Sequence, residues 1–323
     1  MIAIKFMKTK KYLLIVFLSV CALFFYSCDN DDDAVAGQQT DSSEQDNSES
    51  GSITLYRVEG DRIVKKRDEN VTGTNLEYQK DTKKHQQIWD LVKKIIPKEY
   101  MSKMSEFMIY SGEDSGSSGY VFETEKDLSK WQMGIAIDFA YEGGFNKDGE
   151  LAYTIIHEFG HILSLEKEQV DSSINEESCK HYFPGEGCSK EDSYINTLYQ
   201  NHWVDIWKEF NNVDPEKEEE AEKFYQKYKT RYVTQYASTN PGEDIAEVFA
   251  TFVTSKAKPK GENGADKKVQ RLYQKSELVK LRNYIRGNTQ KSSERLLPIP
   301  GTWKNAKTIG DRNKSHCRLH KSR

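Results

Sequence analysis

Two histidines and a glutamate stand close together in residues 151–165, which read LAYTIIHEFGHILSL. His157 and His161 are four residues apart, and four residues of α-helix turn through about 400°, so both rings leave the same face. This HExxH spacing lets two imidazoles bind one Zn²⁺. Glu158 follows the first histidine, where its carboxylate would reach a water on the open position of the metal and remove a proton.

The residues around the motif predict a helix that is buried inside a domain. Apolar side chains cover most of its circumference, and Asp148 and Gly149 precede it as an N-terminal cap. The alternative is that the histidines are hydrogen-bonded core residues and that Glu158 is incidental. Burial of two histidines and a glutamate without hydrogen-bond partners costs free energy. A bound metal offsets that cost, so the pattern favours zinc.

Catalytic zinc needs three protein ligands and one open position, so a third ligand must lie elsewhere. A metzincin would place glycine at position 164 and histidine at position 167. This chain has Ser164 and Lys167 instead, which excludes that class.

A second segment, residues 236–250, offers carboxylates at helical spacing. Asn240 can cap a helix that begins at Pro241, which puts Glu243 and Glu247 four residues apart on one face. Asp244 is expected to face solvent or a loop. A carboxylate presented from a second helix to two histidines on the first is the ligand arrangement of gluzincins.

Together, HEFGH and the downstream Tyr-x₆-Glu-x₃-Glu-x-Phe-Ala resemble the catalytic domain of anthrax lethal factor and related zincins. They are also similar to zinc metallopeptidase lipoproteins of Bacteroidetes. The resemblance covers roughly residues 105–256. It implies an α+β, zincin-like fold, with a small mixed β-sheet packed on the HExxH helix and a mainly helical subdomain after it. It also implies one Zn²⁺ and a peptide or protein substrate.

The resemblance assigns roles to matching positions. Those that bind zinc are His157, His161 and Glu243, and Glu158 is the general base. Glu247 is expected to hold a ligand histidine in its metal-binding tautomer. Tyr236 is expected to donate a hydrogen bond to the oxyanion of the tetrahedral intermediate.

Other assignments of these residues stay open. Glu243 stands three residues after Asn240, where a capping-box glutamate would lie. If Glu243 only caps the helix, Glu247 becomes the third ligand. Tyr232 could serve in place of Tyr236.

Local patterns predict the remaining elements. Residues 53–66 read as a hairpin about Gly60-Asp61, and apolar spacing predicts a helix from Thr82 that ends or kinks at Pro97. Further strands are expected at 107–110, 120–122 and 133–141, and helices at 194–211, 215–235, 241–256 and 266–286. The resemblance makes 133–140 the substrate-facing strand or its neighbour, and the alternative is an ordinary core strand.

Residues 1–27 combine a basic start with an apolar run that is short for a membrane span, as in a lipoprotein signal peptide. Cys28 would then carry the lipid. Residues 28–52 read as a disordered acidic tether, 53–290 as the metallopeptidase domain and 291–323 as a basic C-terminal tail. The acidic run at residues 29–33 resembles the surface-export signal of Bacteroidetes lipoproteins. This resemblance implies an exported protein that is lipid-anchored in the outer membrane, at the cell surface, and the alternative is an ordinary signal peptide or a short membrane anchor.

Removal of residues 1–27 takes four lysines and no acids, and it changes the formal net charge from −4 to −8. An acidic chain argues against nucleic acid as a partner. We expect a monomer.

Cys179 and Cys188 lie nine residues apart, and an exported protein permits a disulfide between them. A second zinc site that includes His181 is the alternative. Cys317 is left unpaired.

The sequence thus predicts a membrane-anchored zinc metalloendopeptidase, and two other functions stay open. One is a non-catalytic surface lipoprotein, whose zinc is structural or whose zincin fold now serves binding. A fourth ligand such as His181 or His202 would favour a structural zinc. The other is a metal-dependent hydrolase of a non-peptide amide.

Overall fold

The computed structural model describes residues 51–113, 115–214 and 217–289. Helices contain 49% of the described residues and strands 16%, which confirms a mixed α+β chain. The predicted signal peptide, Cys28, nearly all of the tether, the C-terminal tail and Cys317 lie outside these residues. None of the described helices has the length and apolar character that a membrane span requires.

Five strands form one mixed sheet in the order β2-β1-β3-β5-β4. They are β1 (Ser52–Glu59), β2 (Arg62–Asp68), β3 (Met104–Tyr110), β4 (Gly119–Glu123) and β5 (Trp131–Ala136). Only β3 and β5 run parallel, and the other neighbours are antiparallel. The predicted hairpin joins β1 to β2, with Gly60 at φ +67° in the turn. The predicted strands at 107–110 and 120–122 form the cores of β3 and β4.

Alternation along the strands gives the sheet two apolar faces. One face belongs to the main core and includes Phe107, Ile109 and Met133, while α2 (Thr82–Ile95) and α5 (Glu150–Leu165) pack into the same core. The other face carries a smaller cluster of Leu55, Met108, Tyr110, Tyr120 and Ala136.

The predicted strand over 133–141 is wrong in its second half. β5 ends at Ala136, and the helical turn α4 (Ile137–Ala140) follows. Asp138 explains the change, since its carboxylate accepts hydrogen bonds from Ser111 Oγ and Gly112 N at 3.1 and 3.0 Å. Ile137 and Ala140 are both buried, and a helical turn can place residues three apart on one side.

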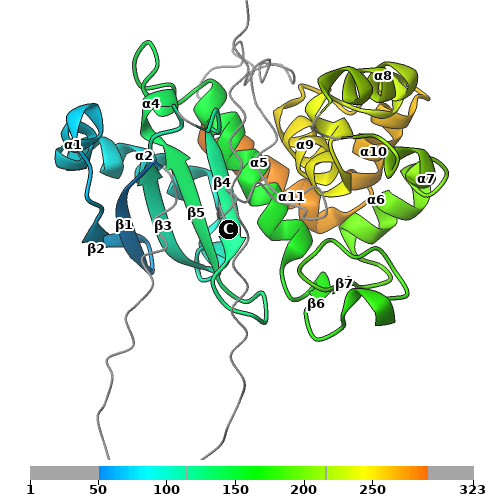
Figure 1. The fold of residues 1–323 in the computed structure, drawn as a ribbon, viewed down its shortest axis with the longest axis horizontal. Coiled ribbons are helices and arrows are strands. Elements are labelled where there is room, and N and C mark those ends of the chain that lie inside the picture. Colours follow the sequence, from blue (N-terminus) through cyan, green and yellow to red (C-terminus); the bar gives the residue numbers. More distant parts are fainter. Residues whose placement is uncertain (1–50, 114, 215–216, 290–323) are drawn as a thin grey trace, which may run out of the picture. The chain divides into compact units, whose positions relative to one another are not determined.

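The order of strands also decides which described strand is outermost. β5 lies between β3 and β4, so both of its edges are already hydrogen-bonded. β4 is the outer strand on the side of α5 (Figure 1). The strand nearest to α5 is therefore β4, the neighbour of the predicted strand.

Helices dominate the chain outside the sheet. α2 stops before Pro97, as predicted, and the predicted helix at 194–211 is broken into α6 (Tyr194–His202) and α7 (Trp207–Phe210). The predicted helix at 266–286 is likewise two, α10 (Gly264–Leu272) and α11 (Ser276–Thr289). The others are α1 (Gly73–Lys80), α3 (Lys98–Met101), α8 (Glu218–Tyr228) and α9 (Pro241–Thr254). The 3₁₀ turns are η1 (Glu176–Ser178), η2 (Lys229–Arg231) and η3 (Tyr236–Ser238), and β6 (Val170–Asp171) pairs with β7 (Cys188–Ser189).

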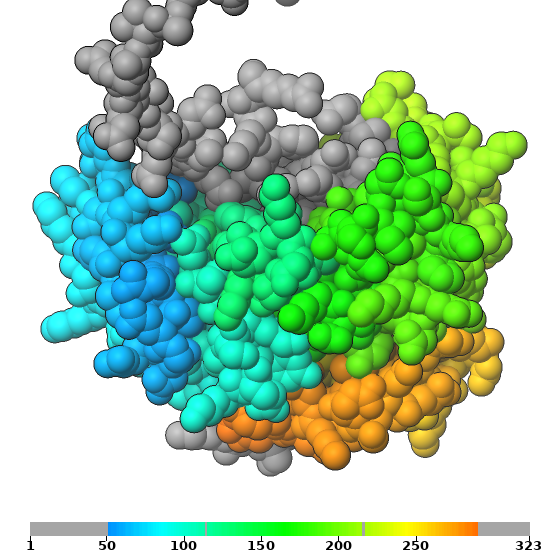
Figure 2. Space-filling model, turned by 90° about the horizontal axis from the view of Figure 1, so that it is seen from below, coloured from blue at the N-terminus to red at the C-terminus, as the bar shows by residue number. Residues whose placement is uncertain are grey.

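Two helices connect the sheet to the helical part. α5 lies between β4 and α9 in Figure 1 and packs along α9. α11 packs against both α2 and α9, and Figure 2 shows its orange residues along the lower edge of the molecule. The position of α9 relative to α5 is therefore held from two sides.

A glycine on β5 gives a test of this packing. A Cβ on Gly134 would lie 2.3 Å from ring atoms of Tyr120, and that ring is only 1% exposed. We expect Gly134→Ala to lower the free energy of unfolding by about 1–3 kcal/mol, because the ring must shift within a packed cluster. The measurement is urea denaturation.

Gly287→Ala is the matched control for this substitution. Gly287 lies in α11 with no heavy atom within 4 Å of its would-be Cβ. This change should be neutral, or stabilising by up to about 1 kcal/mol. Equal effects of the two substitutions would contradict the packing described for β4 and β5.

Candidate metal centre

The HExxH segment lies within α5, as the apolar pattern predicted. Every residue of this helix except Glu150 is buried, including His157 and His161. Gly160 is the point of closest approach to the second helix, because a Cβ there would lie 3.1 Å from the Cα of Ala246 in α9. A residue without a side chain between the histidines therefore lets α9 come close to both rings.

The local structure of α9 places its two glutamates as expected. Asn240 Oδ1 accepts the N–H of Glu243 at 2.9 Å, and Pro241 is the first helical residue. Glu243 and Glu247 are 2% and 0% exposed, and both side chains turn towards α5.

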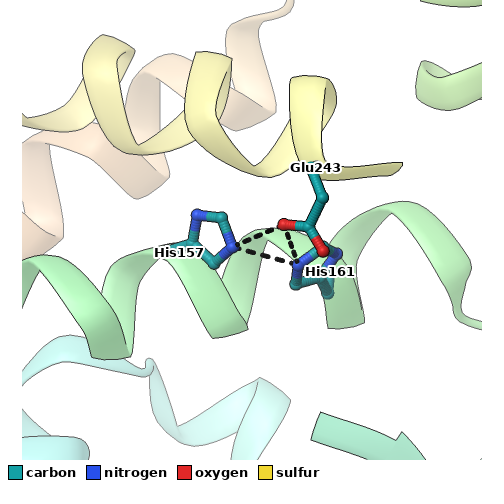
Figure 3. A group of neighbouring side chains, drawn as sticks. All are labelled: His157, His161 and Glu243. Atoms are coloured by element: carbon teal, nitrogen blue, oxygen red, sulfur yellow. Dashed lines mark hydrogen bonds and ion pairs between the residues drawn. The ribbon is translucent and has the colours of Figure 1, made fainter. Parts of the chain in front are cut away.

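Figure 3 shows the two histidines of α5 and Glu243 of α9 around one point. Glu243 Oε2 lies 3.1 Å from His157 Nε2 and 3.4 Å from His161 Nε2, and the two Nε2 atoms are 3.1 Å apart. At a tetrahedral zinc, metal–ligand bonds of about 2.0–2.1 Å separate neighbouring ligand atoms by about 3.3 Å. The three atoms are thus at ligand spacing, and this group could hold a metal ion.

The positions of the imidazole protons also favour a cation between the two Nε2 atoms and Glu243 Oε2. His157 Nδ1 lies 2.8 Å from Glu247 Oε1, which can only accept, so Nδ1 carries a proton. A neutral His157 then directs the Nε2 lone pair at the Glu243 carboxylate, and two acceptors cannot bond to each other. A proton on either Nε2 atom, or a metal ion, must therefore lie among these three atoms.

Without a metal, a proton can take this position. Burial lowers the pKa of His157, but its hydrogen bonds to Glu243 and Glu247, together with the charges of Glu247 and Glu158, raise that pKa well above its ordinary value. Burial opposes ionisation of Glu243 as well, yet the charges of His161 and His157 hold its pKa far below the usual range. Zinc in proteins is bound by histidine nitrogens and carboxylate oxygens, so these two nitrogens and one oxygen suit it.

Unlike Glu243, Glu247 does not belong to the group that could hold a metal ion. Besides His157, its carboxylate accepts hydrogen bonds from Tyr153 OH at 3.1 Å and Thr234 Oγ1 at 2.6 Å. It lies on the far side of the His157 ring and orients that ring.

Sequence reasoning missed both hydroxyl donors to Glu247. Tyr153 precedes His157 by one helical turn, so the spacing could have indicated it. Nothing in the sequence pattern marks Thr234.

Glu158 is 1% exposed, and its Oε2 has no hydrogen-bond partner among the described residues. Burial is the main cause that raises its pKa to about 8 in the metal-free chain. The edge strand passes beside it, since a Cβ on Gly119 of β4 would lie 3.3 Å from Glu158 Oε1. The carboxylate therefore lies between α5 and the edge of the sheet.

The structure places Tyr236, and not Tyr232, beside the histidines. Tyr236 lies in η3 just before α9, with its ring centroid 5.8 Å from that of His157. Tyr232 is buried elsewhere, with its ring centroid 4.6 Å from Lys268 Nζ and 5.4 Å from that of Trp203.

The expectation for Asp244 was wrong. Its side chain is 0% exposed, and it accepts hydrogen bonds from Trp203 Nε1 at 2.7 Å and from Lys268 Nζ. Burial raises its pKa in spite of the neighbouring ammonium group.

Cys179 and Cys188 form a disulfide in the segment after α5. Their sulfurs are therefore not available as zinc ligands, and His181 does not form a second site with them. Within residues 51–289, apart from the gaps at 114 and 215–216, the group that could hold a metal ion consists of His157, His161 and Glu243. It contains neither His181 nor His202.

His202 gives a pH-dependent test of the helical part. Burial, together with the positive charges of Lys268, Arg271 and Arg231, lowers its pKa to about 4, and Asp205 opposes this only in part. Its pKa in the unfolded chain is about 6.5, so the unfolded state binds more protons between these values. We expect this contribution to be complete above about pH 6.5 and to be lost as the pH falls towards 4.

The measurement is the free energy of unfolding at about pH 7 and about pH 4.5 for the natural chain and for His202→Gln. The natural chain should lose more stability on acidification than the variant, because glutamine does not titrate. Equal losses in the two proteins would show that His202 is not held neutral.

Comparisons with family models, curated proteins and solved structures found no match for this chain. Its function is therefore inferred from the geometry of four residues: His157, His161, Glu243 and Glu158.

Proposed function

We propose that this chain is a zinc-dependent metallopeptidase that hydrolyses peptide bonds. The observation that supports it is the convergence of His157 Nε2, His161 Nε2 and Glu243 Oε2 beside a buried, unbonded carboxylate oxygen of Glu158. Zinc bound by these three side chains would polarise a carbonyl group and acidify a water.

Glu158 serves as general base in this proposal. Its carboxylate takes a proton from the attacking water and passes it to the leaving amine.

Glu243 and Glu247 have separate tasks, which follow from their contacts. Glu243 supplies the third ligand atom. Glu247 fixes the Nδ1–H tautomer of His157, so that Nε2 stays free to bind the metal. The hydroxyl groups of Tyr153 and Thr234 hold the Glu247 carboxylate in place.

Tyr236 and β4 make up the side of the site that would meet the substrate. Tyr236 is proposed to donate its hydroxyl proton in a hydrogen bond to the developing oxyanion, because its ring lies beside His157. β4 is the outermost described strand of the sheet, and its Gly119 lies beside Glu158, so this strand is proposed to line the substrate site.

A structural zinc receives no support from the residues that the structure describes. Such a site would need a fourth protein ligand. Glu158, His181 and His202 all lie outside the metal-binding group.

We expect Glu158→Gln to keep the zinc and lose about 10²–10⁴-fold in peptidase activity, because the three ligands remain while the base is removed. The measurements are zinc content by atomic absorption and cleavage of a peptide library. Glu150→Gln, an exposed position on the same helix, is the matched control and should leave both unchanged. Full activity in Glu158→Gln would exclude its role as base.

The second part of the proposal is export as a lipoprotein, which rests on residues 1–33 and is supported by the Cys179–Cys188 disulfide. In a bacterial host, palmitate labelling and membrane association should both be lost in Cys28→Ser. Cys21→Ser is the control, because this cysteine lies inside the apolar run. Labelling that survives in Cys28→Ser would contradict lipidation at this residue.

A further inference from the structure

Directly after the ligand Glu243, the chain buries a second acidic residue that faces away from the metal group. The Asp244 carboxylate accepts hydrogen bonds from Trp203 Nε1 and Lys268 Nζ through the same oxygen, Oδ2. Asp244 and Lys268 are 0% and 3% exposed, so this ion pair is removed from solvent. None of the proposed chemical steps uses it.

The ion pair joins several elements at one point. Lys268 comes from α10, and its Nζ lies 4.6 Å from the ring centroid of Tyr232, just after η2. Trp203 is the C-cap residue of α6. Two donors from different elements thus meet on the first turn of α9.

The cost of burial suggests that this pair does more than stabilise the fold. Taking two charges out of water costs about as much as, or more than, their attraction returns. Apolar residues of similar size are often equally stable or more stable in such positions. The ion pair is directional, however, whereas apolar packing would tolerate a small rotation of the helix.

The first turn of α9 needs such directional control. Successive residues on a helix point about 100° apart, so a rotation that moves Asp244 moves Glu243 by the same angle. The Glu243 oxygen must stay near 3.1 and 3.4 Å from two Nε2 atoms on another helix. Asn240 fixes the backbone at the start of the turn but does not hold this side of it.

We propose that Asp244 and Lys268 are positioning residues, which hold the first turn of α9 so that Glu243 reaches the metal. This inference rests on the proposed metal site. It predicts that the pair contributes to zinc affinity, and that its contribution is separate from the stability of the metal-free fold.

The test is the zinc dissociation constant of the whole chain, measured by competition with a chromophoric chelator. In Asp244→Ala/Lys268→Met both charges are removed together, so no charge is left buried alone. We expect zinc affinity to fall by about 10–100-fold, the range found for residues that orient metal ligands. Asp244→Asn/Lys268→Met keeps an acceptor for Trp203 and should bind zinc with an intermediate affinity.

Arg282→Met is the matched control, because Arg282 of α11 also holds α9 by hydrogen bonds. Arg282 Nε and Nη2 donate to Phe252 O and Ser255 O, both at 2.7 Å, at the opposite end of α9. Its removal should lower the unfolding temperature of the metal-free chain and leave zinc affinity unchanged. Loss of general stability would thereby be distinguished from loss of ligand position.

The outcomes separate this inference from the proposed function. If the natural chain binds no zinc, the metal site itself is wrong. If the natural chain binds zinc and both double variants bind it equally well, the positioning role is overturned. If Asp244→Ala/Lys268→Met does not fold, Asp244→Asn/Lys268→Met decides alone, and natural affinity in that variant overturns the role.

Discussion

The close crossing of α5 and α9 is the constraint on which the site depends. Gly160 leaves room for the backbone of α9 at Ala246, and this approach brings a carboxylate within 3.4 Å of two imidazole nitrogens. Three buried atoms at this spacing can share a proton or bind a metal ion, and their chemical types and distances suit zinc.

Acidic residues surround this crossing, and each carboxylate has different hydrogen-bond partners. Glu247 is bound by His157 and two hydroxyl groups, and Asp244 by Lys268 and Trp203. Among the described residues, Glu158 Oε2 and Asp244 Oδ1 both lack a hydrogen bond, but Asp244 is paired with an ammonium group through its other oxygen and Glu158 is not. A group that must accept and release a proton is better left without strong partners.

The sheet places one of its strands beside the proposed base. Its strand order leaves β4 outermost among the described strands, beside Glu158, while β5 is hydrogen-bonded on both sides. The HExxH helix and β4 therefore lie together, although they are separated in the chain by β5 and α4.

The sequence by itself determined the local features: the histidine pair on one helical face, the Asn240 cap, the Gly60 hairpin and the break before Pro97. Each depends on residues a few positions apart, where helical or strand periodicity and turn geometry decide the outcome. It could not choose between Glu243 and Glu247, and it misplaced Asp244 and the end of β5. Only the tertiary structure decided these, because each depends on a partner distant in the chain: His161, Lys268 or Gly112.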